Sequence, residues 1–120
     1  MQFTGWIPRD ELYELFARAY AFIYPSTFEG FGLPVLEALA AGVPTACSNI
    51  QPVSGIAGDA ALQFNPFSES EILEAMRRLV CDEPLRSALS ALGPARAARF
   101  SWKETARLTL RAIVAAAERS

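Results

Sequence analysis

Short apolar runs alternate with helical segments in the first half of the chain, and this alternation most constrains the fold. The apolar run at 21–24 is followed by a glycine-containing loop, a helical stretch at 33–41 and a second short apolar run at 45–49. Gly42 and Pro44 mark the end of that helical stretch, because glycine often caps helices and proline cannot continue them. Apolar runs of this length, bounded by turn residues, are typical of buried strands. The pattern predicts an α/β fold.

Further elements extend the pattern on both sides. We expect the end of a strand at 3–7, a helix from Pro8, a turn-rich connection at 51–58, a strand at 60–64, and helices that start after Ser68, near Asp82 and after Ser101. Ser68 with Glu71, and Ser101 with Glu104, have the capping-box spacing. The helix near Asp82 is expected to end at Gly93–Pro94 or to continue, bent, to Phe100. The inward faces are expected to be Leu12, Leu15, Phe16 and Ala19 in the first helix, Ile72, Ala75, Met76 and Leu79 after Ser68, and Leu85, Leu89 and Leu92 after Asp82.

This order predicts a partial Rossmann-like open parallel sheet of three or four strands, with a helical C-terminal tail, in a single domain. A length of 120 residues suits one domain, and 52% hydrophobic with 20% charged residues is typical of a folded globular protein. A complete doubly wound sheet normally has more strands. The chain therefore resembles the back half of a larger domain.

Composition excludes several kinds of site and location. The chain has no histidine, which excludes a Ser-His-Asp mechanism within it, and we expect no metal site. Cys47 and Cys81 are far apart and form no CxxC motif, so buried free thiols in a reducing compartment are expected. There is no apolar run long enough to span a membrane and no secretion signal at the N-terminus. We therefore expect a cytoplasmic location.

The net charge of −2 conceals an asymmetry between the two parts of the chain. Residues 1–76 carry two arginines and nine acidic residues, whereas residues 77–120 carry nine basic and four acidic residues. The basic side chains are spread over helical segments among Asp and Glu, without an interleaved aromatic series. That pattern favours a solvated helix surface over a nucleic-acid site, so we expect no nucleic-acid partner.

The stretch EGFGLPVLE at 29–37 lies where a strand is expected to end and a helix to begin. Ligands of open α/β sheets bind at this end of the strands. Gly30 and Gly32 allow the backbone to approach a ligand closely and are expected to adopt conformations closed to other residues. The helix start near Leu33 offers unpaired N–H groups and the positive end of a dipole. A diphosphate fits such a site. The stretch contains neither a P-loop nor GxGxxG, so a nucleoside triphosphate with magnesium is not indicated.

Two carboxylates, Glu29 and Glu37, flank this loop and have two alternative interpretations. In the structural one, Glu29 is a loop residue that caps the helix, and Glu37 is an exposed early-helix residue favoured by the dipole. In the functional one, both accept hydrogen bonds from sugar hydroxyls, because a carboxylate among apolar neighbours needs donors. Acceptors at both ends with N–H donors between them suit a nucleotide sugar.

The stretch PSTFEGFGLPVLEALAAGVPTACSN closely resembles the Glu-x7-Glu region of the retaining GT-B glycosyltransferases of family 4 type, glycosyl transferases group 1. The segments before and after it, FTGWIPRDELYELFARAYAFIYPS, GIAGDAALQFNPFSESEILEAMRRL and FSWKETARLTL, also resemble that family. The resemblance covers nearly the whole chain. It implies a hexosyltransferase that acts with retention of configuration.

The resemblance also implies residue roles. Glu29 would face the transferred sugar as the catalytic-site residue, through positioning and transition-state electrostatics. Backbone groups of Gly30, Phe31, Gly32 and Leu33 would meet sugar and phosphate, and Glu37 would bind the nucleotide ribose. No cofactor and no metal are implied. The donor would be a UDP- or GDP-sugar, with GDP-mannose preferred and UDP-glucose next.

The chain departs from the family pattern in two respects. It has Ser54-Gly55 where the family often has Pro-Glu. The resemblance also implies that an N-terminal acceptor-binding domain, and the first donor-domain strands with an Arg and a Lys that grip the diphosphate, lie outside residues 1–120. We therefore expect this fragment alone to be inactive, with the glycan or lipid-linked acceptor bound through the absent domain.

Three further hypotheses concern partners and class. The truncated sheet would expose a strand edge, which suggests an edge-to-edge or domain-swapped dimer of this fragment. Peripheral membrane association of the full-length enzyme is a second hypothesis. The alternative to an enzyme is a non-catalytic, free-standing α/β binding or interaction module.

Overall fold

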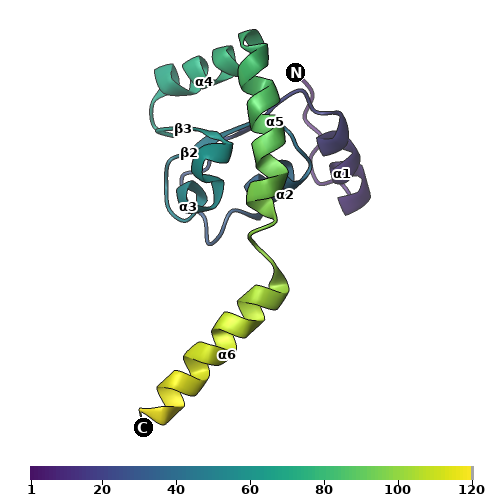
Figure 1. Cartoon of the computed structure of the whole chain (residues 1–120). Helices are drawn as coiled ribbons and strands as arrows, with labels where there is room; N and C mark the ends of the chain where they lie inside the picture. Colours follow the sequence, from purple (N-terminus) through teal and green to yellow (C-terminus); the bar gives the residue numbers. More distant parts are fainter. Residues whose placement is uncertain (120) are drawn as a thin grey trace.

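A computed structural model describes residues 1–119 and shows a parallel sheet with helices on both faces (Figure 1). The helices are α1 (Arg9–Arg18), α2 (Leu33–Ala40), α3 (Val53–Ala57), α4 (Glu69–Cys81), α5 (Glu83–Ala97) and α6 (Trp102–Glu118), with a 3-10 turn, η1 (Gly58–Ala60). The strands are β1 (Phe22–Tyr24), β2 (Thr45–Ser48) and β3 (Leu62–Phe64). They lie in the order β1-β2-β3 and are all parallel. The predicted α/β fold with an open parallel sheet is confirmed.

The central strand β2 separates two layers of core. All four of its residues are buried, as expected for a strand covered on both faces. Cys47 belongs to a core cluster with residues of α2 and α3, whereas its neighbour Ala46 packs with residues of α4. Successive side chains of a strand point to opposite faces, so this alternation follows from the strand itself. Figure 1 accordingly shows α4 on one side of the sheet and α3 on the other.

Helix α5 packs closely along α2, the helix that follows the loop containing Glu29 and Gly30. A Cβ atom on Gly93 would lie 2.7 Å from the carbonyl oxygen of Leu39, so only glycine allows the two helices to approach this far. Ser90 Oγ donates a hydrogen bond of 2.6 Å to the carbonyl oxygen of Gly42, just beyond α2. Of the two predicted courses, the helix takes the second and continues through Pro94 to Ala97.

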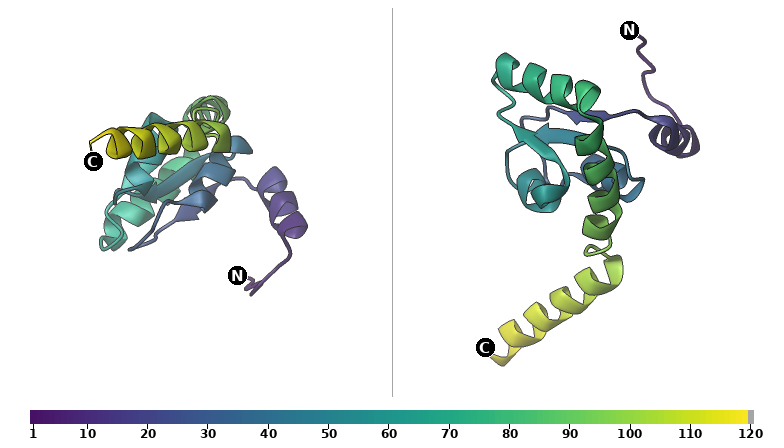
Figure 2. Two further views of the ribbon diagram at one scale, coloured as in Figure 1. Left: turned by 90° about the horizontal axis from the view of Figure 1, so that it is seen from below. Right: turned by 45° about the horizontal axis from the view of Figure 1, so that its top comes forward.

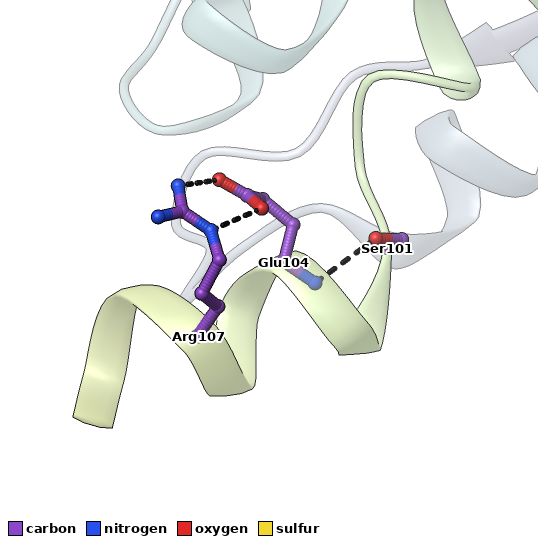
Figure 3. Close-up of polar contacts among 3 residues, drawn as sticks. All are labelled: Ser101, Glu104 and Arg107. Carbon is purple, nitrogen blue, oxygen red and sulfur yellow. Dashed lines mark hydrogen bonds and ion pairs between the residues drawn. The ribbon is translucent and has the colours of Figure 1, made fainter. Parts of the chain in front are cut away.

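Three helices begin at the predicted caps. The side chains of Ser68, Asp82 and Ser101 each accept a hydrogen bond from a backbone N–H three residues later. The reciprocal half of both capping boxes is replaced. Glu71 Oε2 accepts from the N–H of Asn65 at 2.6 Å, and Glu104 is held by Arg107 through two hydrogen bonds of 2.8 and 2.5 Å (Figure 3).

Two predicted elements are wrong. No strand forms at 3–7, where Phe3 and Trp6 are 88% and 89% exposed, because no neighbouring strand is present to pair with them. The connection at 51–58 instead contains α3, entered through a cis peptide bond before Pro52. Its short apolar sequence packs against α2 and β2, and that tertiary contact outweighs the turn signals of Gly55 and Gly58.

Most residues of the predicted inward helix faces are buried or partly buried, but three residues at the margins of these faces are exposed. Phe16, Ala75, Leu79 and Leu89 are buried, and Leu12, Ala19, Ile72 and Leu85 are partly buried. The exceptions are exposed: Leu15, Met76 and Leu92. The sheet has only three strands, and it is too narrow to cover the full width of each apolar stripe.

The last helix, α6, projects away from the rest of the chain (Figures 1 and 2). None of its described residues is buried. The molecule measures 56 × 31 × 30 Å, and its radius of gyration is 16.4 Å, compared with about 13.6 Å for a compact domain of this length. The sequence predicted the helical C-terminal tail. Its separation from the core was not predicted and is seen only in the tertiary structure.

Candidate functional site

The candidate site lies in the loop between β1 and α2, as the sequence predicted. The chain leaves β1 at Tyr24, passes through Glu29 and Gly30, and enters α2 at Leu33. Because β1 is parallel to β2, this loop lies at the carboxyl edge of the sheet. That edge is where open α/β sheets bind ligands.

Two hydroxyl groups hold the carboxylate of Glu29. Tyr24 donates a hydrogen bond to Glu29 Oε1, and Ser26 Oγ lies 3.0 Å from the same oxygen. Ser26 Oγ also lies 3.0 Å from the carbonyl oxygen of Phe28, a contact within the loop itself. Partial burial of Tyr24, its hydrogen bond to Glu29 and the nearby negative charge together raise the pKa of its phenol to about 12. The carboxylate is therefore fixed in direction and does not cap α2 through its side chain.

Gly32 sets the geometry at the start of α2. It is the N-cap residue, with φ of +107°, a conformation that residues with a side chain rarely adopt. Its carbonyl accepts from the N–H groups of Val35 and Leu36 at 3.1 and 3.2 Å. Within residues 1–119, the N–H groups of Phe31, Gly32 and Leu33 have no acceptor. The loop thus presents a short row of free donors at the positive end of the helix.

Gly30 differs from Gly32 in its backbone. Its φ is not positive, and a Cβ atom placed on it would meet nothing within 4 Å. The prediction that both glycines adopt conformations closed to other residues is therefore wrong for Gly30. Only the predicted close approach of a ligand to the backbone still requires glycine at this position.

Glu37 lies on the second turn of α2, and its side chain is 25% exposed. Its carboxylate is not enclosed by apolar groups alone, because Arg9 at the start of α1 approaches it to 3.8 Å. Arg9 is itself 73% exposed, so this ion pair contributes little to stability. The carboxylate of Glu37 can therefore exchange the arginine for other donors at small cost.

An apolar hollow of about 360 Å³ lies beside the loop, between the start of α2 and the start of α6. The side chains of Phe31 and Leu33 line it on one side, and those of Phe100 and Trp102 on the other. The sequence predicted only backbone roles for Phe31 and Leu33 and no role in the site for Phe100. Tyr24 and Ser26 were also missed, although both are polar residues at the end of a predicted strand, and that position is the signal that could have found them.

The two cysteines differ in environment. Both are free thiols, but Cys47 is buried and Cys81 is exposed, so the expectation of buried thiols is correct for only one. Burial raises the pKa of the Cys47 thiol to about 12. Neither lies in the loop between β1 and α2.

Residues 1–119 contain neither a candidate metal site nor a helix that could span a membrane. No three His, Cys, Asp or Glu side chains gather there as ligands for a metal ion. None of the helices in this part of the chain is both long and apolar enough to cross a bilayer.

Comparison with known proteins assigns the chain to a family. The sequence profile described as "Glycosyl transferases group 1" matches residues 1–96, which include every element from α1 to most of α5. The chain belongs to the glycosyl transferases group 1 family. The resemblance of the stretch around Glu29 and Glu37 is therefore confirmed at the level of the family.

Named relatives in this family include bacterial mannosyltransferases. The chain is 38% identical over 112 residues to O-antigen chain mannosyltransferase B of Escherichia coli. This match covers 93% of this chain and 29% of that protein. It is also 38% identical over 108 residues to the serotype-specific mannosyltransferase WbdA of Escherichia coli. That match covers 90% of this chain and 13% of the relative. The chain thus spans less than a third of the length of these relatives.

Solved structures show the same fold. Sucrose-phosphate synthase from Thermosynechococcus elongatus superimposes with a TM-score of 0.83 over 99% of this chain and 31% of that chain, at 24% sequence identity. WaaG, a glycosyltransferase involved in lipopolysaccharide biosynthesis, superimposes with a TM-score of 0.69 over 78% of this chain and 26% of that chain, at 27% identity. The three-stranded parallel sheet and its helices match part of a GT-B domain.

Proposed function

We propose that residues 1–120 form the C-terminal part of the nucleotide-sugar-binding domain of a retaining glycosyltransferase. The full enzyme transfers a hexosyl group from a nucleotide-sugar donor to a glycan or lipid-linked acceptor. The observation that carries the proposal is the row of free N–H donors from Phe31 to Leu33, with the fixed carboxylate of Glu29 just before it and Glu37 one turn beyond.

Each part of the loop has a role that its chemistry suits. The free amides and the helix dipole accommodate the diphosphate and stabilise the negative charge that develops on it as the glycosidic bond breaks. Glu29 accepts hydrogen bonds from the transferred sugar, and its negative charge stabilises the positive charge that develops on the sugar ring. Tyr24 and Ser26 hold it in that orientation before the donor arrives. We assign no covalent step to it.

Glu37 receives the ribose of the nucleotide. Vicinal hydroxyls can donate two hydrogen bonds to one carboxylate, and a charged acceptor makes these bonds stronger than neutral ones. The exposed Arg9 gives up its contact with Glu37 when the donor binds. The glycine at position 30 leaves the backbone open to the sugar and the adjoining phosphate.

We infer the donor and the acceptor from the chemistry of the loop and from the relatives of the chain. Mannosyltransferases at 38% identity support a mannosyl group, and hence a GDP-mannose type donor, with a UDP-glucose type as the alternative. The acceptor site, together with the basic residues that complete the diphosphate site, lies in parts of the enzyme beyond residues 1–120. Peripheral membrane association of the full-length enzyme suits a lipid-linked acceptor.

A dimer of this chain is a further part of the proposal. The outer edge of β1 has no strand partner among the described residues. Unpaired strand edges pair readily with other chains. Light scattering of the 120-residue chain should show a concentration-dependent dimer, and a monomer at high concentration would contradict it.

Calorimetric titration of the chain with UDP and GDP tests the nucleotide site. We expect Glu37→Gln to weaken binding by roughly 10- to 100-fold, because hydrogen bonds to a charged acceptor are lost. Glu14→Gln, a substitution at an exposed residue of α1, is the matched control and should bind as the unaltered chain does. Equal affinity of the Glu37→Gln chain would refute the ribose assignment, and no binding of either nucleotide by any form would favour a non-catalytic module.

A further inference from the structure

The side chain of Phe31 ties the glycine loop to the far end of α5. Its ring meets that of Phe100 edge to face, with centroids 6.2 Å apart and an interplanar angle of 81°. This is a favoured geometry for an aromatic pair. Phe100 lies three residues beyond the end of α5 and directly precedes Ser101, the N-cap of α6. A residue of the loop is thus held by a residue about 70 positions later in the chain.

The loop also rests on α3, at Gly32. A Cβ atom on Gly32 would lie 3.1 Å from Val53 Cγ2 and 3.7 Å from Ile56 Cδ1. Both of these residues are buried, so they form a fixed surface beneath the loop. The segment that carries the free amides is therefore in contact with α3 at Gly32 and with Phe100 through the ring of Phe31.

Arg96 joins these two supports. Its Nε donates to the carbonyl oxygen of Ile56 at 2.9 Å, and Nη2 donates to that of Gly55 at 2.5 Å. The same guanidinium lies 5.8 Å from the centre of the Phe100 ring. It also covers Gly58, where a Cβ atom would come within 2.9 Å of Arg96 Cζ. One side chain of α5 therefore fixes both α3 and the ring that holds Phe31.

The base of this arrangement is rigid. Helix α5 lies against α2 at the close contact of Gly93 with Leu39, and Ala97 is part of the core between them. Arg96 and Phe100 are on either side of Ala97 in sequence. Their positions are consequently set by the core, and they transmit that constraint to the loop.

We propose that Phe100 and Arg96 are positioning residues that hold the row of free N–H donors at Phe31, Gly32 and Leu33 in the direction required by the donor diphosphate. This inference rests on the proposed nucleotide-sugar site. Neither residue touches the donor. Both act through the Phe31 ring and through α3, and they reduce the conformational freedom that the loop would otherwise lose on binding.

The decisive variant is Phe100→Ala, measured by calorimetric titration of the 120-residue chain with GDP and UDP. We expect a loss of affinity of about three- to tenfold, the range that corresponds to one aromatic pair. A second readout needs no ligand: nitrogen-15 relaxation should show a lower order parameter for the Phe31 and Gly32 amides. Phe100→Tyr retains the ring and should restore both values. Phe67→Ala removes an equally large, 79% exposed ring from the turn before α4 and should change neither.

The outcomes separate this inference from the proposed function. Unchanged affinity and unchanged order parameters in a folded Phe100→Ala chain would overturn the inference. If the unaltered chain binds neither nucleotide, the proposed function fails, and the order parameters alone decide on Phe100. If Phe100→Ala does not fold, Phe31→Ala removes the same ring pair at an exposed position, and an unchanged Gly32 order parameter would then overturn it.

Discussion

Substituting Gly32 by alanine tests the reasoning that links the fold to the candidate site. Gly32 has a φ of +107° at the N-cap of α2, and its Cα faces the buried side chain of Val53. Gly30, two residues earlier in the same loop, has neither constraint. The pair offers a substitution and its control within one loop.

Two contributions give the expected magnitude for Gly32→Ala. A residue with a Cβ atom in the left-handed region costs about 1–2 kcal/mol. The new methyl group would lie 3.1 Å from Val53 Cγ2, so Val53 must move by a few tenths of an ångström within a packed core. Crowding of this kind adds up to about 1 kcal/mol. We expect the free energy of unfolding to fall by about 1–3 kcal/mol.

Urea unfolding followed by circular dichroism measures this change. Gly30→Ala should alter stability by less than about 0.5 kcal/mol, because its methyl group meets nothing and its backbone is unstrained. It should nevertheless weaken nucleotide binding, since the methyl group would lie where we propose that the ligand approaches the backbone. Val53→Ala combined with Gly32→Ala separates the two costs, because it relieves the crowding and leaves the backbone strain.

The results that would refute this reasoning are specific. If Gly32→Ala and Gly30→Ala unfold at the same urea concentration, the loop does not hold Gly32 in the left-handed conformation against Val53. If Gly30→Ala binds nucleotide as tightly as the unaltered chain, the backbone at Gly30 does not approach the ligand.

Three further predictions concern the tyrosine, the thiols and catalysis. The folded-state pKa of Tyr24, about 12, exceeds its ordinary value of 10.0, so its contribution to stability is present below about pH 10 and is lost as the pH rises toward 12. Thermal unfolding between about pH 9 and pH 11 should therefore show a shallower loss of stability for Tyr24→Phe, and an equal slope would contradict the partial burial of the phenol together with its hydrogen bond to Glu29. A thiol reagent should label the exposed Cys81 quickly and the buried Cys47 only on unfolding, and mass spectrometry after brief labelling would reveal the opposite order. The 120-residue chain alone should transfer no sugar from GDP-mannose or UDP-glucose, because our proposal places the basic diphosphate contacts and the acceptor site beyond it, and measurable turnover by a radiolabelled assay would disprove this.

Local signals predicted most of the elements correctly. Ser68 and Ser101 cap their helices as expected because a serine oxygen reaches a backbone N–H three residues on without help from the rest of the fold. Gly42 ends α2 for a similarly local reason, a φ of +72° that glycine adopts at little cost. Helix α3 was not predictable, since Gly55 and Gly58 favour a turn and only packing against α2 and β2 stabilises it as a helix.

The candidate site also combines features that the sequence predicts with features that depend on the tertiary structure. The spacing of Glu29 and Glu37 around a glycine loop is a sequence property, and it led to the loop between β1 and α2. The hydrogen bonds of Tyr24 and Ser26 to Glu29 depend on how the loop turns back on the strand. The contact of Arg9 with Glu37 depends on where α1 lies against α2.

The sequence by itself determined the order of the elements, the caps, the parallel α/β class and the loop that carries the chemistry, because each of these depends on residues close together in the chain. Only the tertiary structure decided which margins of the helices remain exposed, which cysteine is buried and how Phe100 and Arg96 support the loop. The contacts of Arg96 and Phe100 join residues that are about 40 to 70 positions apart. Their geometry exists only once α5 has packed on α2, and no local pattern specifies that packing.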